Sequence, residues 1–236
     1  MQTHFDQIAA QTEISEVLRY SRRAFFEHGA ISMSYHVIPL FKESDGTATA
    51  VYSDGYSRQW LDLYETAGFR ANDPIPARVM RHGSMMTWLD AMRSAPNTDA
   101  QENYMKTGGR HGLIHGVGFP LFGPGGRNAY ASVDFGKPIT EVDPEALGTV
   151  RSIAQAGHQR ICVLLDEDVD RPALSAREIE VLEWVARGKS TSSIATILEL
   201  SPDTVKTYSK RIYAKLDVTD RVGAVVKALR MGLVEV

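Results

Sequence analysis

The sequence predicts an α+β protein with two domains: an α/β/α sandwich around a mostly antiparallel sheet, then a small all-α helix-turn-helix domain of four helices. Three observations predict this. Helical and strand-like patterns mix over residues 1–165, whereas only helical patterns occur over 174–236. Acidic residues crowd the segment between them, which is typical of a solvated linker over 166–173. The charge also changes sign, because residues 171–236 hold 11 Lys and Arg against 8 Asp and Glu, whereas residues 1–170 hold 15 against 21.

The composition narrows the class of protein. Hydrophobic residues make up 43% and charged residues 23% of the chain, as in ordinary globular proteins. No apolar run reaches the roughly 18 residues of a membrane helix, and no secretory signal pattern opens the chain. The single cysteine, Cys162, excludes an internal disulfide framework and multi-cysteine zinc patterns, and we expect it to be a buried apolar residue. We therefore expect a cytoplasmic protein with no membrane partner.

The elements of the first domain follow from periodicity and from residues that end helices. Apolar residues at helical spacing predict a first helix over 4–27, and Gly68 ends a second helix that begins near Tyr56. Asp143 caps a long helix over 144–167. Strand-like runs occupy 30–38, 47–53, 116–122 and 129–136, and the last two flank a Pro-Gly-Gly turn that predicts a hairpin. We expect helices on both faces of this sheet.

The second domain has clear helix starts. Ser175 and Glu178 form a capping box, and Gly188 suits the end of that helix. A short helix begins at Ser190 or at the next residue, Ser201 caps a third helix with proline at its first position, and a fourth helix ends near residue 232. A short helix, a turn and a capped basic helix form the layout of a helix-turn-helix.

The third helix has an apolar face and a basic face. Val205, Ile212 and Leu216 can face the core, which leaves the basic residues outside, where they fit the major groove of DNA. The residues that we expect to contact DNA are Lys189, Thr191, Ser201, Thr204, Lys206, Thr207, Lys210 and Arg211. The alternative is a solvated helix in an all-α interaction domain.

The stretch from Leu174 to Leu233 resembles the DNA-binding domain of LuxR-type transcription regulators. The match runs without a gap through Glu178, Gly188, Lys206 and Arg221, and one departure is Tyr208, where many relatives carry histidine. The resemblance implies double-stranded promoter DNA as a partner, a homodimer on a near-palindromic site, and RNA polymerase as a further partner. This domain follows several kinds of input domain. The first 170 residues show no phosphoacceptor pattern of a receiver domain.

An aromatic series in the first domain points to a ligand. Tyr56, Trp60 and Tyr64 are spaced by four, as on one helix face, and Asp73 follows. Periodicity alone favours a packed core. The indole, phenol and carboxylate groups also suit a ligand with donors and acceptors.

The order and spacing of these residues resemble the acyl-homoserine-lactone-binding domain of quorum-sensing LuxR regulators. The matching residues are Trp60, Tyr64, Asp73, Pro74, Trp88 and Gly116, with the segment "HGLIHGVGFPLFG". The resemblance implies that Trp60 binds the lactone carbonyl, Asp73 the amide N–H, and Tyr56 and Ser132 the amide carbonyl. Tyr64 and Trp88 would pack around the ligand, and Pro74, Gly116 and Gly118 would shape the pocket. Val133, Phe135 or the methionines of residues 80–86 are candidates for the acyl-chain lining. Asn72 and Gly118 depart from common family residues, which bears on acyl-chain specificity.

Two other classes of function can be compared with this one. For an enzyme, His111 and His115 could hold a metal, but the neighbouring glycines disfavour a helix there. Cys162 lies within a predicted amphipathic helix, and we see no catalytic base for it in the sequence. We therefore expect no enzyme, no metal and no cofactor beyond a small-molecule ligand. The remaining alternative is an orphan LuxR-type regulator that senses another molecule or acts without ligand.

Overall fold

The computed structural model describes residues 2–38, 51–167 and 172–234, which form two compact units. Helices α1 to α8 and one sheet make up the first unit, and helices α9 to α12 the second. Half of the predicted linker, residues 168–171, and the start of the predicted strand over 47–53 lie outside the described residues. No helix in the described part of the chain is long and apolar enough to cross a bilayer.

A five-stranded antiparallel sheet forms the middle of the first unit. Its strands, in spatial order, are β2 (Val51–Asp54), β1 (Ser32–Ile38), β5 (Asn128–Asp134), β4 (Gly116–Leu121) and β3 (Met86–Thr87). The short 3-10 turn Pro124–Gly126 joins β4 to β5, as the hairpin prediction requires. Strand β3, which is two residues long, has no strand-like signal in the sequence.

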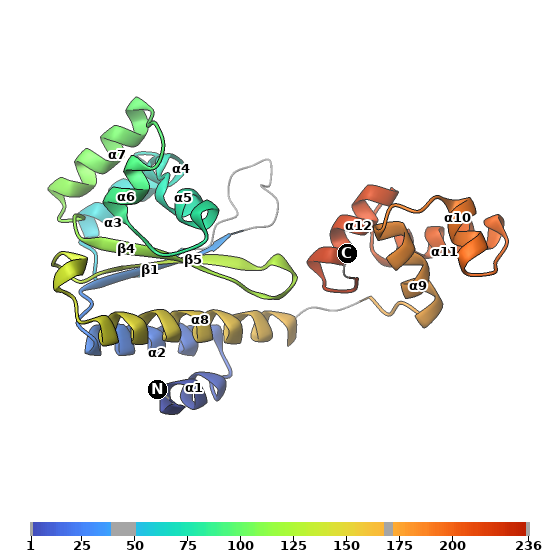
Figure 1. Ribbon diagram of the computed structural model, residues 1–236, viewed down its shortest axis with the longest axis horizontal. Coiled ribbons are helices and arrows are strands. Elements are labelled where there is room, and N and C mark those ends of the chain that lie inside the picture. The colour runs from blue at the N-terminus through green and yellow to red at the C-terminus, as the bar shows by residue number, and fades with distance from the viewer. Residues whose placement is uncertain (1, 39–50, 168–171, 235–236) are drawn as a thin grey trace. The chain divides into compact units, whose positions relative to one another are not determined.

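Helices cover both faces of the sheet, so the predicted α/β/α sandwich is confirmed (Figure 1). One face carries α2 (Ile14–Glu27) and the long α8 (Pro144–Glu167), with α1 (Gln2–Ala9) packed against them. The other face carries five shorter helices: α3 (Arg58–Thr66), α4 (Phe69–Asn72), α5 (Ile75–His82), α6 (Trp88–Arg93) and α7 (Asp99–Arg110). The sequence predicted only the first of these five.

The predicted helix over 4–27 is wrong as a single element, because the chain breaks between α1 and α2. Glu13 is extended, with φ −127° and ψ 144°, so helical hydrogen bonds cannot continue through it. The break lets α1 fold back, and Ile8 is 2% exposed in the core shared with α2 and α8.

Alternation along the strands gives the sheet two different faces. On β5, Ala131 and Val133 belong to the apolar core beneath α2 and α8, whereas Tyr130 and Ser132 point to the side of α3. On β1, Met33 and Tyr35 face that core, whereas Ser34 and His36 face the α3 side. The apolar face stabilises the fold, and the polar face is left for the site described below.

The second unit is the predicted four-helix helix-turn-helix. Its helices are α9 (Ala176–Ala186), α10 (Thr191–Ile197), α11 (Pro202–Lys215) and α12 (Arg221–Arg230). Ser190 proves to be the N-cap of α10, and the Ser201 hydroxyl accepts a hydrogen bond from the Thr204 backbone N–H at 3.1 Å. The expected inward residues of α11, Val205, Ile212 and Leu216, are at most 1% exposed.

Candidate functional site

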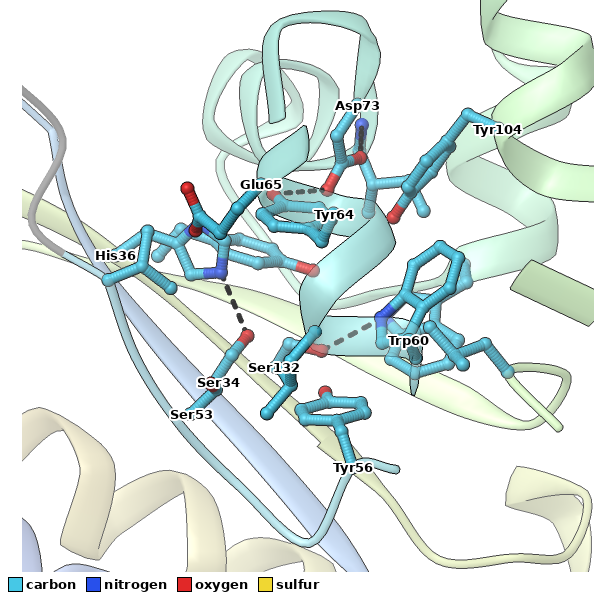
Figure 2. Close-up of a pocket in the computed structure, with 16 residues that line it drawn as sticks. Ser34, His36, Ser53, Tyr56, Trp60, Tyr64, Glu65, Asp73, Tyr104 and Ser132 are labelled. Atoms are coloured by element: carbon cyan, nitrogen blue, oxygen red, sulfur yellow. Dashed lines mark hydrogen bonds between the residues drawn. The ribbon is translucent and has the colours of Figure 1, made fainter. Parts of the chain in front are cut away.

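A cavity of about 150 Å³ lies between the polar face of the sheet and α3 (Figure 2). Its walls combine aromatic rings with hydroxyl, imidazole and carboxylate groups. The strands contribute Ser34, His36, Val51, Ser53, Tyr130 and Ser132. The α3 segment contributes Tyr56, Trp60, Leu61, Tyr64 and Glu65, and the remaining elements contribute Asp73, Ile75, Trp88, Tyr104 and Leu113.

All six residues expected to bind ligand line this one cavity: Tyr56, Trp60, Tyr64, Asp73, Trp88 and Ser132. The interpretation of three aromatic residues on one helix face is wrong for Tyr56. Helix α3 begins at Arg58, and the hydroxyl of its N-cap Ser57 accepts a hydrogen bond from the Trp60 backbone N–H at 3.2 Å. Tyr56 reaches the cavity from the segment before the helix.

Asp73 is the acidic group of the upper wall in Figure 2. The Tyr64 hydroxyl donates to its Oδ2 at 3.2 Å, and the Ile75 backbone N–H donates to its Oδ1 at 2.9 Å. Burial raises the pKa of Asp73 to about 6, although the hydrogen bonds from Ile75, Tyr104 and Tyr64 oppose that shift. Near neutral pH the group is therefore mostly a carboxylate, a strong acceptor for a ligand N–H.

The sheet side of the cavity offers donors opposite Asp73. The Trp88 indole N–H donates to Ser132 Oγ at 3.0 Å, and the Ser132 hydroxyl also hydrogen-bonds with the phenols of Tyr56 and Tyr130. Trp88 was expected only to pack around the ligand, and the structure adds this positioning bond. The Trp60 indole N–H has no acceptor among the described residues, and its ring stacks on Phe69 at 5.8 Å.

Two glycines allow aromatic rings to approach β4 closely. A Cβ on Gly116 would lie 2.2 Å from the Trp88 ring, and a Cβ on Gly118 would lie 2.4 Å from the Tyr130 ring. Gly118, the family departure noted in the sequence, thus gives room to Tyr130. Pro74 is buried and stands as the N-cap of α5, directly after Asp73.

The expected acyl-chain lining is wrong for Val133 and Phe135, which lie in the core on the opposite face of the sheet. The physical reason is strand alternation, which sends their side chains away from Ser132. No methionine of residues 80–86 lines the cavity in the described part of the chain. Sequence reasoning missed the other lining residues, among them the polar and aromatic residues Ser34, His36, Tyr104 and Tyr130. The alternating polar residues of "SMSYH" could have revealed the first two, whereas nothing local marks Tyr104.

The second unit presents the predicted basic surface on α11. Lys206, Thr207, Lys210 and Arg211 are exposed, and Lys206 Nζ lies 3.1 Å from Asp203 Oδ1, which is 90% exposed. Lys189 and Ser201 are also exposed, whereas Thr191 and Thr204 are half-buried.

Other basic side chains of this unit hold the frame together. Lys215 donates to Glu178 Oε2 at 2.7 Å and to the Ala173 carbonyl at 2.9 Å. Arg221 donates to the carbonyls of Val185 and Lys189 at 2.9 and 2.8 Å. The Lys215 contacts tie α11 to α9, and the Arg221 contacts tie α12 to the end of α9, so these two cations are structural, unlike those on the outer face of α11.

The histidines and the cysteine considered for catalysis lie in other settings. His111 caps the end of α7 and lies against the Trp60 ring, with ring centroids 5.8 Å apart. Cys162 is 1% exposed, and burial raises the pKa of its thiol. The described residues hold no cluster of three His, Cys, Asp or Glu side chains suited to a metal ion.

Comparison with known proteins gives a match to each unit. The model of the autoinducer binding domain matches residues 13–161, and that of the LuxR family of bacterial regulatory proteins matches residues 172–228. The chain is 30% identical over 206 residues to the quorum sensing-dependent transcriptional regulator RpaR of Rhodopseudomonas palustris, covering 85% of this chain and 82% of RpaR. It is 27% identical over 222 residues to the quorum-sensing regulator RhlR of Pseudomonas aeruginosa, covering 90% of this chain and 86% of RhlR. The crystal structure of Escherichia coli SdiA has the same fold, with a TM-score of 0.76, 22% identity and coverage of 98% and 96% of the two chains.

Proposed function

Because the chain belongs to the LuxR family of quorum-sensing transcription regulators, with an autoinducer-binding domain ahead of its DNA-binding domain, we propose that its signal is an acyl-homoserine lactone. We propose further that residues 1–165 bind the lactone and dimerise, and that residues 174–236, beyond a linker, bind a near-palindromic promoter site as a homodimer. Regulation of this kind takes place at the chromosome, in the cytoplasm of a bacterium, where RNA polymerase is a further partner.

The observation that carries the lactone proposal is the placement of acceptor and donors across the cavity. A secondary amide points its N–H and its carbonyl in opposite directions. Asp73 lies on one side of the cavity and Ser132 and Tyr56 on the other, as Figure 2 shows. An amide between them donates to the Asp73 carboxylate and accepts from the two hydroxyls. The Trp60 indole N–H then binds the lactone carbonyl, and Trp88 and Tyr64 enclose the ring.

DNA binding is proposed to depend on the outer face of α11. Its lysines and arginine can bind phosphates and guanine edges, and Thr204 and Thr207 can bind phosphates. One helix contacts few base pairs, so two copies with half-sites about 10 base pairs apart, or a multiple of that, double the contacts. On α12, Val222 is 71% exposed and is a candidate for the pairing face within the second unit.

The test is a thermal melt of the purified full chain with acyl-homoserine lactones of short, medium and long chain. A suitable lactone at a hundredfold excess over its dissociation constant stabilises the folded form by about 2.7 kcal/mol. We expect the melting temperature to rise in the wild type, to stay unchanged in Asp73→Ala, and to rise less in Trp60→Phe. A wild type that no lactone stabilises, but that binds DNA fully, would contradict the proposal.

That contrary result would favour the second candidate, a LuxR-type regulator with another signal or none. The specific observation in its favour is the polar floor of the cavity, since Ser34, His36 and Ser53 are poor partners for a plain hydrocarbon chain. Mass spectrometry of extracts from protein expressed with and without lactones separates the two candidates.

A further inference from the structure

One acidic side chain stands in the middle of the basic outer face of α11. Asp203 is the second residue of this helix and its single acidic residue. Asp203, Thr207 and Lys210 follow one another at helical spacing, and all three are exposed. Val205 and Ile212 lie on the opposite side of the helix, buried in the core of the second unit. A carboxylate is therefore at the centre of the surface that is proposed to enter the major groove.

A carboxylate at this place weakens binding to most DNA sequences. The phosphates repel it, and in the major groove guanine presents two acceptors, while thymine presents an acceptor and a methyl group. Only the amino groups of cytosine and adenine can donate to it there. An acid in the first turn also stabilises a helix through the helix dipole, and Asp203 could do so without any part in recognition. These two roles lead to different results when the carboxylate is removed.

The neighbouring Lys206 completes a donor and acceptor pair on the outer face. Lys206 Nζ lies 3.1 Å from Asp203 Oδ1, and the two side chains are 63% and 90% exposed. The carboxylate has a second oxygen, and the ammonium has further protons, for other partners. In a C·G base pair, cytosine N4 and guanine O6 are hydrogen-bonded to each other and lie about 2.9 Å apart at the major-groove edge. The two protein groups thus have nearly the spacing of the two base groups.

Other base pairs fit this pair of side chains less well. In an A·T pair, adenine N6 can donate to the carboxylate, but the adjacent N7 is an acceptor and repels it. Thymine O4 can accept from the ammonium, but a methyl group lies beside it, whereas guanine O6 has N7 as a second acceptor. A G·C pair in the reverse orientation turns its acceptors to the carboxylate and its amino group to the ammonium.

Building on the proposed binding of DNA by α11, we propose that Asp203 and Lys206 together read one C·G base pair in each half-site. The carboxylate accepts from cytosine N4, and the ammonium donates to guanine O6 and N7. Both residues are in the N-terminal half of α11, the part of a recognition helix that reaches base edges in helix-turn-helix proteins. Asp203 is then a specificity-determining residue, because it lowers the affinity for other sequences more than for the cognate one.

The experiment selects binding sites from a pool of randomised duplex DNA, using the folded full chain with a panel of acyl-homoserine lactones present. Fluorescence anisotropy then gives dissociation constants for the selected site and for its single-base-pair variants. We expect the wild type to enrich C·G at one position of each half-site. Exchange for A·T at that position should weaken binding about fivefold to 150-fold.

Three variants separate base reading from charge. Asp203→Ala should lose the preference at that position alone and should bind random-sequence DNA more tightly than the wild type does. Asp203→Asn should change the preference to A·T, because a side-chain amide can pair with both N6 and N7 of adenine. Glu180→Gln removes one negative charge from the exposed ion pair with Arg177 on α9, and it should keep the wild-type preference.

The results also separate this assignment from the proposed function. If Asp203→Ala enriches the same sequence as the wild type, the assignment is overturned, DNA binding stands, and Asp203 only stabilises the start of α11. A change of preference in Glu180→Gln equal to that in Asp203→Ala overturns it as well, because charge alone would then explain both. If the folded wild type enriches no sequence, the proposed recognition of DNA itself fails and the assignment falls with it.

Discussion

At the scale of single residues, Asp73 links the stability of the ligand-free protein to pH. Its pKa is raised from 3.8 to about 6, so the folded state binds its proton more tightly than the unfolded chain does. The contribution of this proton to the folding stability is fully present below about pH 4 and is lost as the pH rises through about 6. The loss by pH 7 is at most about 3 kcal/mol, because one pKa unit corresponds to about 1.4 kcal/mol.

We therefore predict that Asp73→Asn raises the melting temperature of the ligand-free protein at pH 7.5 and leaves it nearly unchanged at pH 4. The measurement is a series of thermal melts from pH 4 to pH 8, with Asp62→Asn, an exposed carboxylate on α3, as the control. The same variant should lose the stabilisation by lactone. A difference between wild type and variant that does not change with pH would argue against a strained carboxylate.

Gly118 gives a second prediction at this scale. In Gly118→Ala the new methyl group meets the Tyr130 ring at 2.4 Å, so the ring must move into the cavity. We predict a loss of about 1–3 kcal/mol in unfolding free energy, together with weaker ligand binding. Gly109→Ala on α7, where a Cβ meets nothing within 4 Å, should instead stabilise the protein by about 0.5–1 kcal/mol. Urea unfolding of both variants decides between these outcomes, and equal effects would refute the steric argument.

At the scale of elements, the Glu178–Lys215 contact joins α9 to α11. The Lys215 ammonium lowers the pKa of Glu178, which is 3% exposed. The contact therefore adds stability above the ordinary carboxyl range, near pH 4.5, and loses it as the pH falls through the lowered value. We predict that Glu178→Gln costs about 1–3 kcal/mol at pH 7 and progressively less as the pH falls below the ordinary carboxyl range. Glu180→Gln, in an exposed pair with Arg177, should change stability by less than about 1 kcal/mol when both are measured by denaturant unfolding.

The outer face of α11 is tested by removing its charges. Lys206→Ala with Arg211→Ala should weaken DNA binding by about 1–3 kcal/mol for each side chain that reads a base, and should reduce the slope of log affinity against log salt for each phosphate that is no longer bound. Lys106→Ala removes one charge from exposed α7 in the first unit and serves as the control. Fluorescence anisotropy at several salt concentrations gives both quantities. Unchanged affinity in the double variant at moderate salt would rule out this face.

Elements with strong local signals were predictable, and those set by tertiary contacts were not. Ser175, Ser201 and the Pro-Gly-Gly turn mark their own positions, so α9, α11 and the β4–β5 hairpin follow from local chemistry. Helices α4 and α6 are four and six residues long, too short to show a period.

The residues of the candidate site also fall into a predictable and an unpredictable group. Trp60 and Asp73 stand in a recognisable spacing, whereas Tyr104 and Tyr130 join them only because α7 and β5 pack around the cavity.

At the scale of the whole molecule, the signal is expected to act through stability and pairing. Without ligand, the cavity is expected to hold water. That water would contact the Asp73 carboxylate, the Trp60 indole and the apolar walls. In the proposed scheme, ligand binding would favour the folded first unit by mass action, and a dimer would then present two α11 helices at a set spacing. We predict that the dimer fraction and the affinity for an operator rise together when a suitable lactone is added. Sedimentation that shows only monomer at micromolar concentration, with lactone and operator present, would exclude this scheme.

The alternating strands of the sheet have a consequence for how such a protein can change. Residues at one parity of β1 and β5, such as Met33 and Val133, hold the fold together, while their immediate neighbours Ser34 and Ser132 face the cavity. At these positions of β1 and β5, alternate residues therefore build the core beneath α2 and α8 and the wall of the cavity. A lineage, or an engineer, can exchange the cavity-facing serines without opening a hole in the core beneath α2 and α8, whereas Tyr130, which packs in a second buried cluster with Trp60 and Tyr64, serves both the fold and the cavity.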